Sequence, residues 1–247
     1  MTTINAVAYI VSGAIEILLP IALGFYFTRR FGTSWKSWFV GAMMFLISLV
    51  RLPVNNYVNT VIASGEITYY TYLMIYFVAS FTAGLFEETA RYIGLRYLIK
   101  KKDYGVGITY GAGHGGIESI LLVGINVLTM GFILLTNPES IPETQLYSIT
   151  AMPWYLPLIG AYERVISIAT HISLSVMVLE TIRTKNLKYY LIAVVTHTAI
   201  DYLSTSALNY SILYAELVLT GFAIGLTQWA YTKIKQEPTD DTVSPQP

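Results

Sequence analysis

The residues best suited to chemistry in this chain are two adjacent carboxylates, Glu87 and Glu88, followed by Arg91. They follow residues 69–85, a run without any charged side chain, with only Phe86 in between. A charge at the centre of a membrane helix costs about 2.5–3.5 kcal/mol or more, so such groups face a bundle interior and have partners. Arg91 is four residues from Glu87 and three from Glu88, and on a helix it can pair with either. We interpret the other carboxylate as a candidate general base; the alternative is a purely structural Glu–Arg pair.

The histidines of the chain all lie in other apolar segments. His114 and Glu118 are four residues apart, at the end of a segment, 105–116, that contains six glycines. His197 and Asp201 repeat this spacing, which places both members of each pair on one helix face. Imidazole and carboxylate groups are ligands that zinc prefers, and a second carboxylate often orients such an imidazole.

The third histidine, His171, follows the adjacent pair Glu163 and Arg164. Arg164 and His171 are seven residues apart and share a helix face, whereas Glu163 projects in another direction. Two interpretations remain open for this segment. His171 is either a third ligand or an isolated histidine beside a neutralised Glu–Arg pair.

The elements that must position these residues are membrane helices. The chain is 54% hydrophobic and only 12% charged, about half the charged fraction of a typical soluble domain. Apolar runs of about 20 residues recur throughout, which predicts an all-α polytopic membrane protein with about seven transmembrane helices around a buried polar site. The predicted spans of this single domain, residues 1–235, are roughly 6–28, 38–62, 67–95, 105–135, 156–182, 188–208 and 211–233.

Three segments carry separate predictions. Arg51 and Pro53 interrupt the second span, which could end near Leu52 and leave residues 54–65 as a loop. The proline-containing stretch 136–155 is predicted to be an irregular segment at the membrane interface. The polar residues 236–247 are predicted to form a disordered cytoplasmic tail.

Basic residues fall at alternate ends of the predicted spans, which predicts the orientation in the cell membrane. By the positive-inside rule the N-terminus is outside and the C-terminus is cytoplasmic. Zero net charge indicates no nucleic-acid partner, and the absence of cysteine excludes disulfides and thiolate ligands. Twelve of the 15 Lys and Arg residues follow the alternation: Arg29, Arg30, Lys36, Arg96, Lys100, Lys101, Lys102, Arg183, Lys185, Lys188, Lys233 and Lys235.

The basic clusters also give a depth for each candidate residue. Glu88, His114 and His171 are each 12 residues from a basic residue at the cytoplasmic boundary, and His197 is nine residues from one. At about 1.5 Å per residue, all four lie about 14–18 Å into the membrane. We therefore predict that four helices place these side chains in one layer, around a common polar site.

Taken together, these residues resemble the motifs of the CAAX-prenyl-protease and bacteriocin-processing superfamily. The likeness covers residues 84–201 and is best with the YhfC-like branch of membrane peptidases, to which the His171 segment is well suited; the PrsW proteases are similar too. This chain departs from the superfamily's usual pattern in a shorter Glu–Arg spacing, in Tyr110 where Phe is usual, and in Asp201 where Asn is frequent. The matching motifs are Glu87-Glu88-x-x-Arg91, Tyr110-x-x-x-His114 with Glu118, and His197-x-x-x-Asp201.

The resemblance implies an intramembrane peptidase that hydrolyses a membrane protein or a lipidated peptide. In that mechanism Glu87 or Glu88 activates water and His114 assists. We expect zinc to be held by His114, His171 and His197; without a metal, the same Glu and His114 would activate water directly. A proton- or cation-coupled transporter and a catalytically silent scaffold remain alternatives, because buried Glu, His and Asp also form ion relays. The residues expected to support the site through hydrogen bonds are Arg91, Glu118, Glu163 and Asp201.

Overall fold

The computed structural model describes residues 2–66 and 68–236, and within these ranges the chain is built from helices without any strand. The predicted all-α fold is therefore confirmed. The predicted tail, 236–247, lies outside the described residues except for Gln236. The elements in chain order are α1 (Thr2–Arg30), α2 (Trp35–Ser48), α3 (Arg51–Ala63), α4 (Tyr69–Ile93), η1 (Gly94–Leu98), α5 (Tyr104–Glu118), η2 (Ser119–Gly124), α6 (Ile125–Thr136), η3 (Pro138–Ser140), α7 (Glu143–Ala151), α8 (Leu156–Thr184), α9 (Lys188–Ala207) and α10 (Ile212–Lys235).

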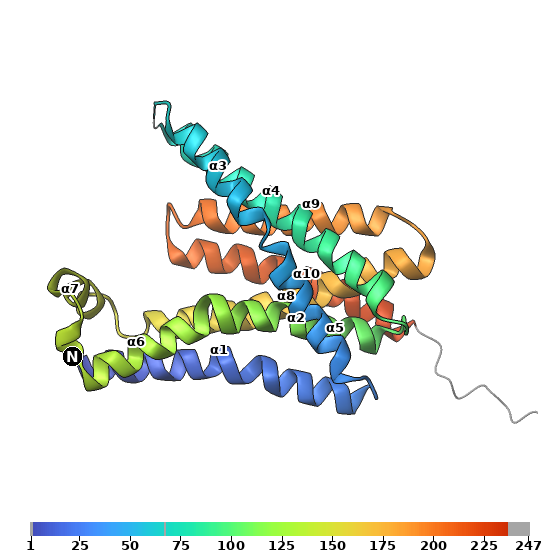
Figure 1. Cartoon of the computed structure of the whole chain (residues 1–247), viewed down its shortest axis with the longest axis horizontal. Helices are drawn as coiled ribbons and strands as arrows, with labels where there is room; N and C mark the ends of the chain where they lie inside the picture. The colour runs from blue at the N-terminus through green and yellow to red at the C-terminus, as the bar shows by residue number, and fades with distance from the viewer. Residues whose placement is uncertain (1, 67, 237–247) are drawn as a thin grey trace, which may run out of the picture.

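Six stretches in the described part of the chain are long and apolar enough to cross a membrane, so this is a polytopic membrane protein. The seventh predicted span, 188–208, forms α9 but is not among the six, because its polar residues, His197 and Asp201 among them, lower its hydropathy. Helix α9 packs against α4 and α10, and Figure 1 shows it running alongside α10. The six stretches are Thr3–Arg30, Trp35–Ala63, Tyr69–Leu98, Tyr104–Thr136, Leu156–Thr184 and Ile212–Lys235.

The second stretch, Trp35–Ala63, consists of two helices, α2 and α3, separated by a break before Pro53. Proline at position 53 has no N–H to donate to the carbonyl of Leu49 four residues earlier. That carbonyl instead accepts from the N–H of Leu52 at 2.9 Å, and the chain turns between α2 and α3. The predicted loop over 54–65 is wrong, because α3 continues to Ala63. The break places Arg51, at the start of α3, inside the bundle.

The connection 136–155 also contains more regular structure than predicted. It forms the short η3 and the nine-residue α7 instead of a wholly irregular segment. The side-chain amide of Asn5 donates to the carbonyl of Ile149 at 3.2 Å and holds α7 against the start of α1.

Helix α5 lies at the centre of the bundle, in contact with α1, α2 and α8. All residues from Tyr104 to Gly116 are buried, and glycines allow the neighbouring backbones to approach closely. A Cβ atom at Gly113 would overlap the carbonyl oxygen of Trp38 on α2, and one at Gly111 would lie 2.5 Å from Cα of Ile172 on α8. The glycine cluster therefore allows α5 to pack closely against α2 and α8, which places His114 between these two helices.

We predict that Gly113→Ala lowers the free energy of unfolding by about 1–3 kcal/mol, because the added methyl group overpacks the α2–α5 contact. Gly221→Ala on α10 is the matched control, since a Cβ atom there meets nothing within 4 Å. It should leave stability unchanged or raise it by up to about 1 kcal/mol through helix propensity. Thermal unfolding of the two variants in detergent measures the difference, and equal melting temperatures would contradict the packing role.

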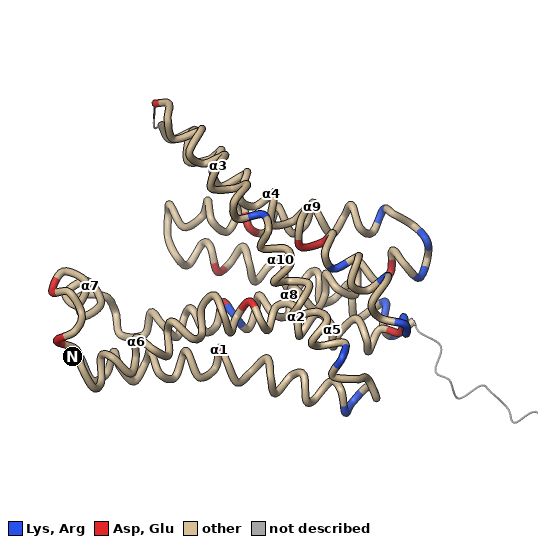
Figure 2. The backbone as a smooth tube through the Cα atoms, viewed as in Figure 1, with Lys and Arg blue, Asp and Glu red and all other residues tan. Residues whose placement is uncertain are grey.

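Basic residues gather at one end of the bundle, as the alternation along the sequence predicted. Figure 2 shows Lys and Arg at the end where the chain leaves α10, whereas the tips of α3 and α7 at the other end show acidic residues only. The three arginines outside the alternation, Arg51, Arg91 and Arg164, are instead largely buried within the bundle. The positive-inside rule predicts that the basic end is cytoplasmic.

Candidate active site

The innermost part of the site is an ion pair between Glu88 and Arg91, one turn apart on α4. Both side chains are completely buried, and the guanidinium of Arg91 donates to Oε1 of Glu88. The same carboxylate oxygen lies 2.7 Å from Nδ1 of His197 on α9. Glu88 is therefore held by a cation on its own helix and in turn orients the ring of His197.

Glu87 points in a different direction because adjacent helical residues project about 100° apart. Its Oε1 lies 2.9 Å from Nη2 of Arg51, and its Oε2 lies 3.3 Å from Nε2 of His114 and 3.9 Å from Nε2 of His197. The sequence left open which carboxylate Arg91 would hold. The structure assigns Glu88 to Arg91 and leaves Glu87 facing the histidines.

Arg51 is the site residue that sequence reasoning missed. Spacing along the sequence does not single it out, because its span carries no second ionisable residue at helical spacing. Its partner, Glu87, lies 36 residues later on α4, and only the packing of α3 against α4 brings the two together. The available signal was an arginine beside a proline in an otherwise apolar span, a place where a charge needs a partner.

The three histidines converge, as predicted from their depths. The ring centroids of His114 and His171 are 5.3 Å apart, and those of His171 and His197 are 5.5 Å apart. All three rings are at least 95% buried. Helices α5, α8 and α9 thus deliver one imidazole each to the carboxylates of α4.

His171 is engaged at both ring nitrogens. Nη2 of Arg91 lies 2.9 Å from its Nδ1, and since a guanidinium only donates, Nδ1 is the acceptor. The ring hydrogen is then on Nε2, which lies 2.8 Å from Oε2 of Glu118. The sequence paired Glu118 with His114 on the same helix; that partner is wrong, because this face of α5 meets α8 and Glu118 reaches across to His171.

The remaining predicted residues lie at the edge of the site. Arg164 bridges two acids: its Nη1 is 3.1 Å from Oε1 of Glu118, and its Nη2 pairs with the adjacent Glu163. Glu163 is thus linked to Glu118 through Arg164, and it also lines the cavity beside the site. Asp201 lies one turn from His197, as its spacing predicted, with Oδ2 at 3.6 Å from Nε2 of the ring.

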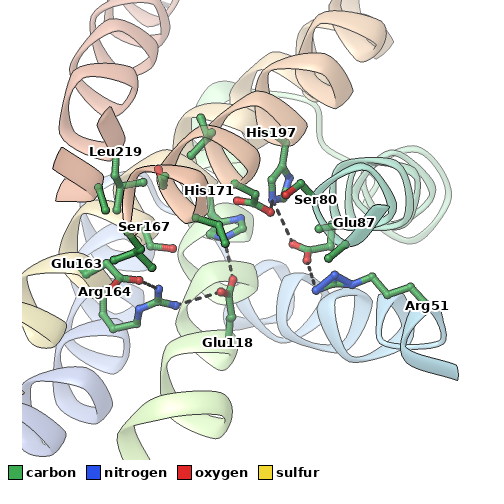
Figure 3. A pocket seen from close by; sticks show the side chains of 18 of the residues that line it. Arg51, Ser80, Glu87, Glu118, Glu163, Arg164, Ser167, His171, His197 and Leu219 are labelled. Atoms are coloured by element: carbon green, nitrogen blue, oxygen red, sulfur yellow. Dashed lines mark hydrogen bonds and ion pairs between the residues drawn. The ribbon is translucent and has the colours of Figure 1, made fainter. Parts of the chain in front are cut away.

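A cavity of about 440 Å³ opens beside these groups, and Figure 3 shows the side chains that line it. Glu87, His171 and His197 contribute to its wall, whereas Glu88 and Arg91 do not. Figure 3 shows Arg51 reaching Glu87 from one side and Arg164 reaching Glu118 from the other. Of the two adjacent carboxylates, Glu87 is thus the one that a molecule in the cavity can meet.

The donor atoms in this centre are suited to a metal ion. Ligand atoms of Glu87, His114 and His171 all lie within 4.8 Å of one another, so this buried group can hold a metal; it contains Glu87 in place of His197, the third histidine of the predicted ligand set. Nδ1 of His114 is buried without a hydrogen-bond partner among the described residues, and Nε2 of His197 is free to coordinate because Nδ1 donates to Glu88. His171 would have to release Arg91 to offer a nitrogen. A set of nitrogen and oxygen donors of this kind fits zinc.

The fold and site define a polytopic helical membrane protein with a buried Glu–His centre halfway along its helices. Residues 15–223 match the model of the family described as YhfC intramembrane metalloprotease, and the chain belongs to that family. It is 32% identical over 218 residues to the "Uncharacterized membrane protein YhfC" of Bacillus subtilis (strain 168), an alignment that covers 80% of this chain and 83% of the relative. No solved structure matches the chain. The resemblance to the YhfC-like branch drawn from the motifs is confirmed.

Proposed function

We propose that this protein is an intramembrane peptidase that hydrolyses a peptide bond in a membrane protein or a lipidated peptide. The observation that carries the proposal is the position of Glu87. Its carboxylate is 97% buried, faces a cavity at the depth of the histidines, and lies within 4 Å of two imidazoles. A carboxylate in that position can act on water that enters the cavity, and the family's description supports the same reaction class.

Glu87 is the proton acceptor in this mechanism. Arg51 holds Oε1, so Oε2 is the atom that takes a proton from the attacking water and later delivers it to the leaving amine. Glu88 is unsuited to this task because Arg91 and His197 already occupy its Oε1 and it does not line the cavity. It keeps His197 in position instead.

The histidines would hold a zinc ion, with His114 and His197 offering free nitrogens and His171 joining when Arg91 releases it. When bound, zinc would polarise the peptide carbonyl and make the attacking water more acidic. Glu118 lies next to Nε2 of His171 and is placed to orient the ring through that nitrogen when Nδ1 becomes a ligand. Without metal, His114 beside Oε2 of Glu87 would orient the water directly.

We predict about one zinc ion per chain in protein purified without chelators, and loss of that metal in His114→Ala. Inductively coupled plasma mass spectrometry of the purified chain measures the ratio. Phe45→Leu is the control, because the Phe45 ring contacts His114 and offers no ligand atom. A metal-free preparation that still cleaves its substrate would remove zinc from the proposal and leave the Glu87 step standing.

The reaction class is tested by comparing new N-termini in the membrane proteome of a host that carries the wild-type chain or Glu87→Gln. We expect a set of cleaved membrane proteins that is present only with the wild type. If the two proteomes are identical while reconstituted protein conducts ions in a Glu87-dependent manner, the peptidase proposal is wrong and the transporter alternative is favoured.

A further inference from the structure

The cavity beside Glu87 extends along α9 as a channel. Five residues of α9 and its C-cap line the channel at positions i, i+3, i+4, i+7, i+8 and i+11, the pattern of one helix face. The first and last are 11 positions apart, or about 16 Å at about 1.5 Å per residue. The channel therefore runs from His197 to the connection between α9 and α10, at the end of the bundle opposite the basic residues (Figure 2). The six residues are His197, Ile200, Asp201, Ser204, Thr205 and Leu208.

The wall formed by α9 and α10 carries two carboxyl side chains, Asp201 and Glu216, without a matching arginine or lysine. The two arginines that line the channel are already engaged, Arg51 with Glu87 and Arg164 with Glu118 and Glu163. Neither forms an ion pair with Lys or Arg in the described part of the chain, although Oδ2 of Asp201 lies 3.6 Å from Nε2 of His197. Oε2 of Glu216 is buried and makes no hydrogen bond there.

The opposite wall offers a neutral hydrogen-bond donor. Asn55 on α3 is 92% buried, and its Oδ1 accepts from the hydroxyl of Thr82 at 2.7 Å. Its side-chain nitrogen forms no hydrogen bond with any described residue, although the side chain lines the channel. An amide donor in this position matches a peptide carbonyl, which needs a partner wherever an extended chain lies at membrane depth.

We propose that the channel admits an extended peptide segment that carries a positive charge and enters from the end opposite the basic residues. Asp201 and Glu216 pair with the charge, and Asn55 donates to a backbone carbonyl. About five extended residues, at about 3.3 Å each, fill the 16 Å between the channel mouth and the histidines. This inference names the substrate class of the proposed peptidase and so rests on that function, but its charge preference is measurable without cleavage.

The absence of cysteine from the chain allows a direct test. Ser204→Cys places a thiol in the channel at low cost, because the serine hydroxyl makes no hydrogen bond there. The thiol is modified with the cationic reagent trimethylammonioethyl methanethiosulfonate and with its anionic sulfonatoethyl analogue, on intact cells and on inverted vesicles. Ser64→Cys, exposed at the same end of the bundle, gives the intrinsic rate ratio of the two reagents.

We expect the ratio of the cationic to the anionic labelling rate to be at least about 10-fold higher at Ser204→Cys than at Ser64→Cys, because a charged cleft concentrates counter-ions. Asp201→Asn with Glu216→Gln should return the ratio to the control value. Trilysine amide should slow the labelling and triglutamate should not; Asn55→Leu should weaken the protection. Labelling of intact cells is expected, since the positive-inside rule places this end outside.

Equal ratios at the two cysteines, or equal protection by both tripeptides, would overturn the cationic substrate class even if the protein proves to be a peptidase. Labelling confined to inverted vesicles would overturn the direction of access. Charge-selective labelling in a protein that cleaves nothing would instead contradict the peptidase and leave the channel assignment intact.

Discussion

Glu87→Gln is expected to lower the rate of peptide hydrolysis by about 10²–10⁴-fold, the range that general acid–base catalysis contributes. The substitution preserves the size of the side chain and a contact with Arg51, but an amide oxygen does not accept a proton from water at neutral pH. The measurement is the cleavage rate of a substrate identified from the membrane proteome, assayed with purified protein in lipid. The melting temperature should change little, because the cavity beside Glu87 admits water to the unpaired arginine.

Two other glutamates make this prediction specific. Glu16→Gln is the matched control: Glu16 is 1% exposed and equally isosteric with Gln, but it does not line the catalytic cavity. It should retain activity within a few fold. Glu88→Gln should instead lower the melting temperature clearly and affect activity less than Glu87→Gln does, because it leaves the buried charge of Arg91 without its counter-ion. If Glu88→Gln abolished cleavage in a stable protein while Glu87→Gln remained active, the assignment of the proton acceptor would be wrong.

Arg91→Met is expected to lower the free energy of unfolding by about 3–5 kcal/mol, the effect of removing one partner of a buried ion pair. Arg91 is completely buried and contacts both Glu88 and His171, so its loss leaves a carboxylate uncompensated and an imidazole nitrogen unbonded. For a chain of this size, we expect the melting temperature to fall by about 10 °C or more. Thermal unfolding in detergent measures the change.

Arg51→Met tests whether the stability cost depends on how deeply the arginine is buried or only on the loss of its positive charge. Arg51 is 13% exposed at the cavity, so water can compensate Glu87, and the melting temperature should fall much less than in Arg91→Met. Adding Glu88→Gln to Arg91→Met removes the uncompensated carboxylate and should recover part of the loss. If Arg91→Met were as stable as Arg51→Met, the Glu88–Arg91 pair would not be the buried support that the structure indicates.

Local spacing predicted those parts of the site that lie within one helix. Glu88 and Arg91 are three residues apart on α4 and form their pair, and Asp201 lies one turn from His197 beside its ring. The depth of each histidine also followed from residue counts, because helical rise is constant. Contacts between helices could not be predicted from spacing within one segment. Glu118 was paired with His114, although its contact is with His171.

The sequence by itself determined that this chain is an all-α membrane protein whose carboxylates and imidazoles share one depth. Hydrophobic run length and helical periodicity are local properties, and the cost of burying charge requires those groups to face one another. Only the tertiary structure decided that Arg51 holds Glu87 and that Glu88 lies behind it, away from the cavity. The rotation of each helix about its axis depends on close packing, such as the contact of Gly113 with Trp38, and no single segment encodes it.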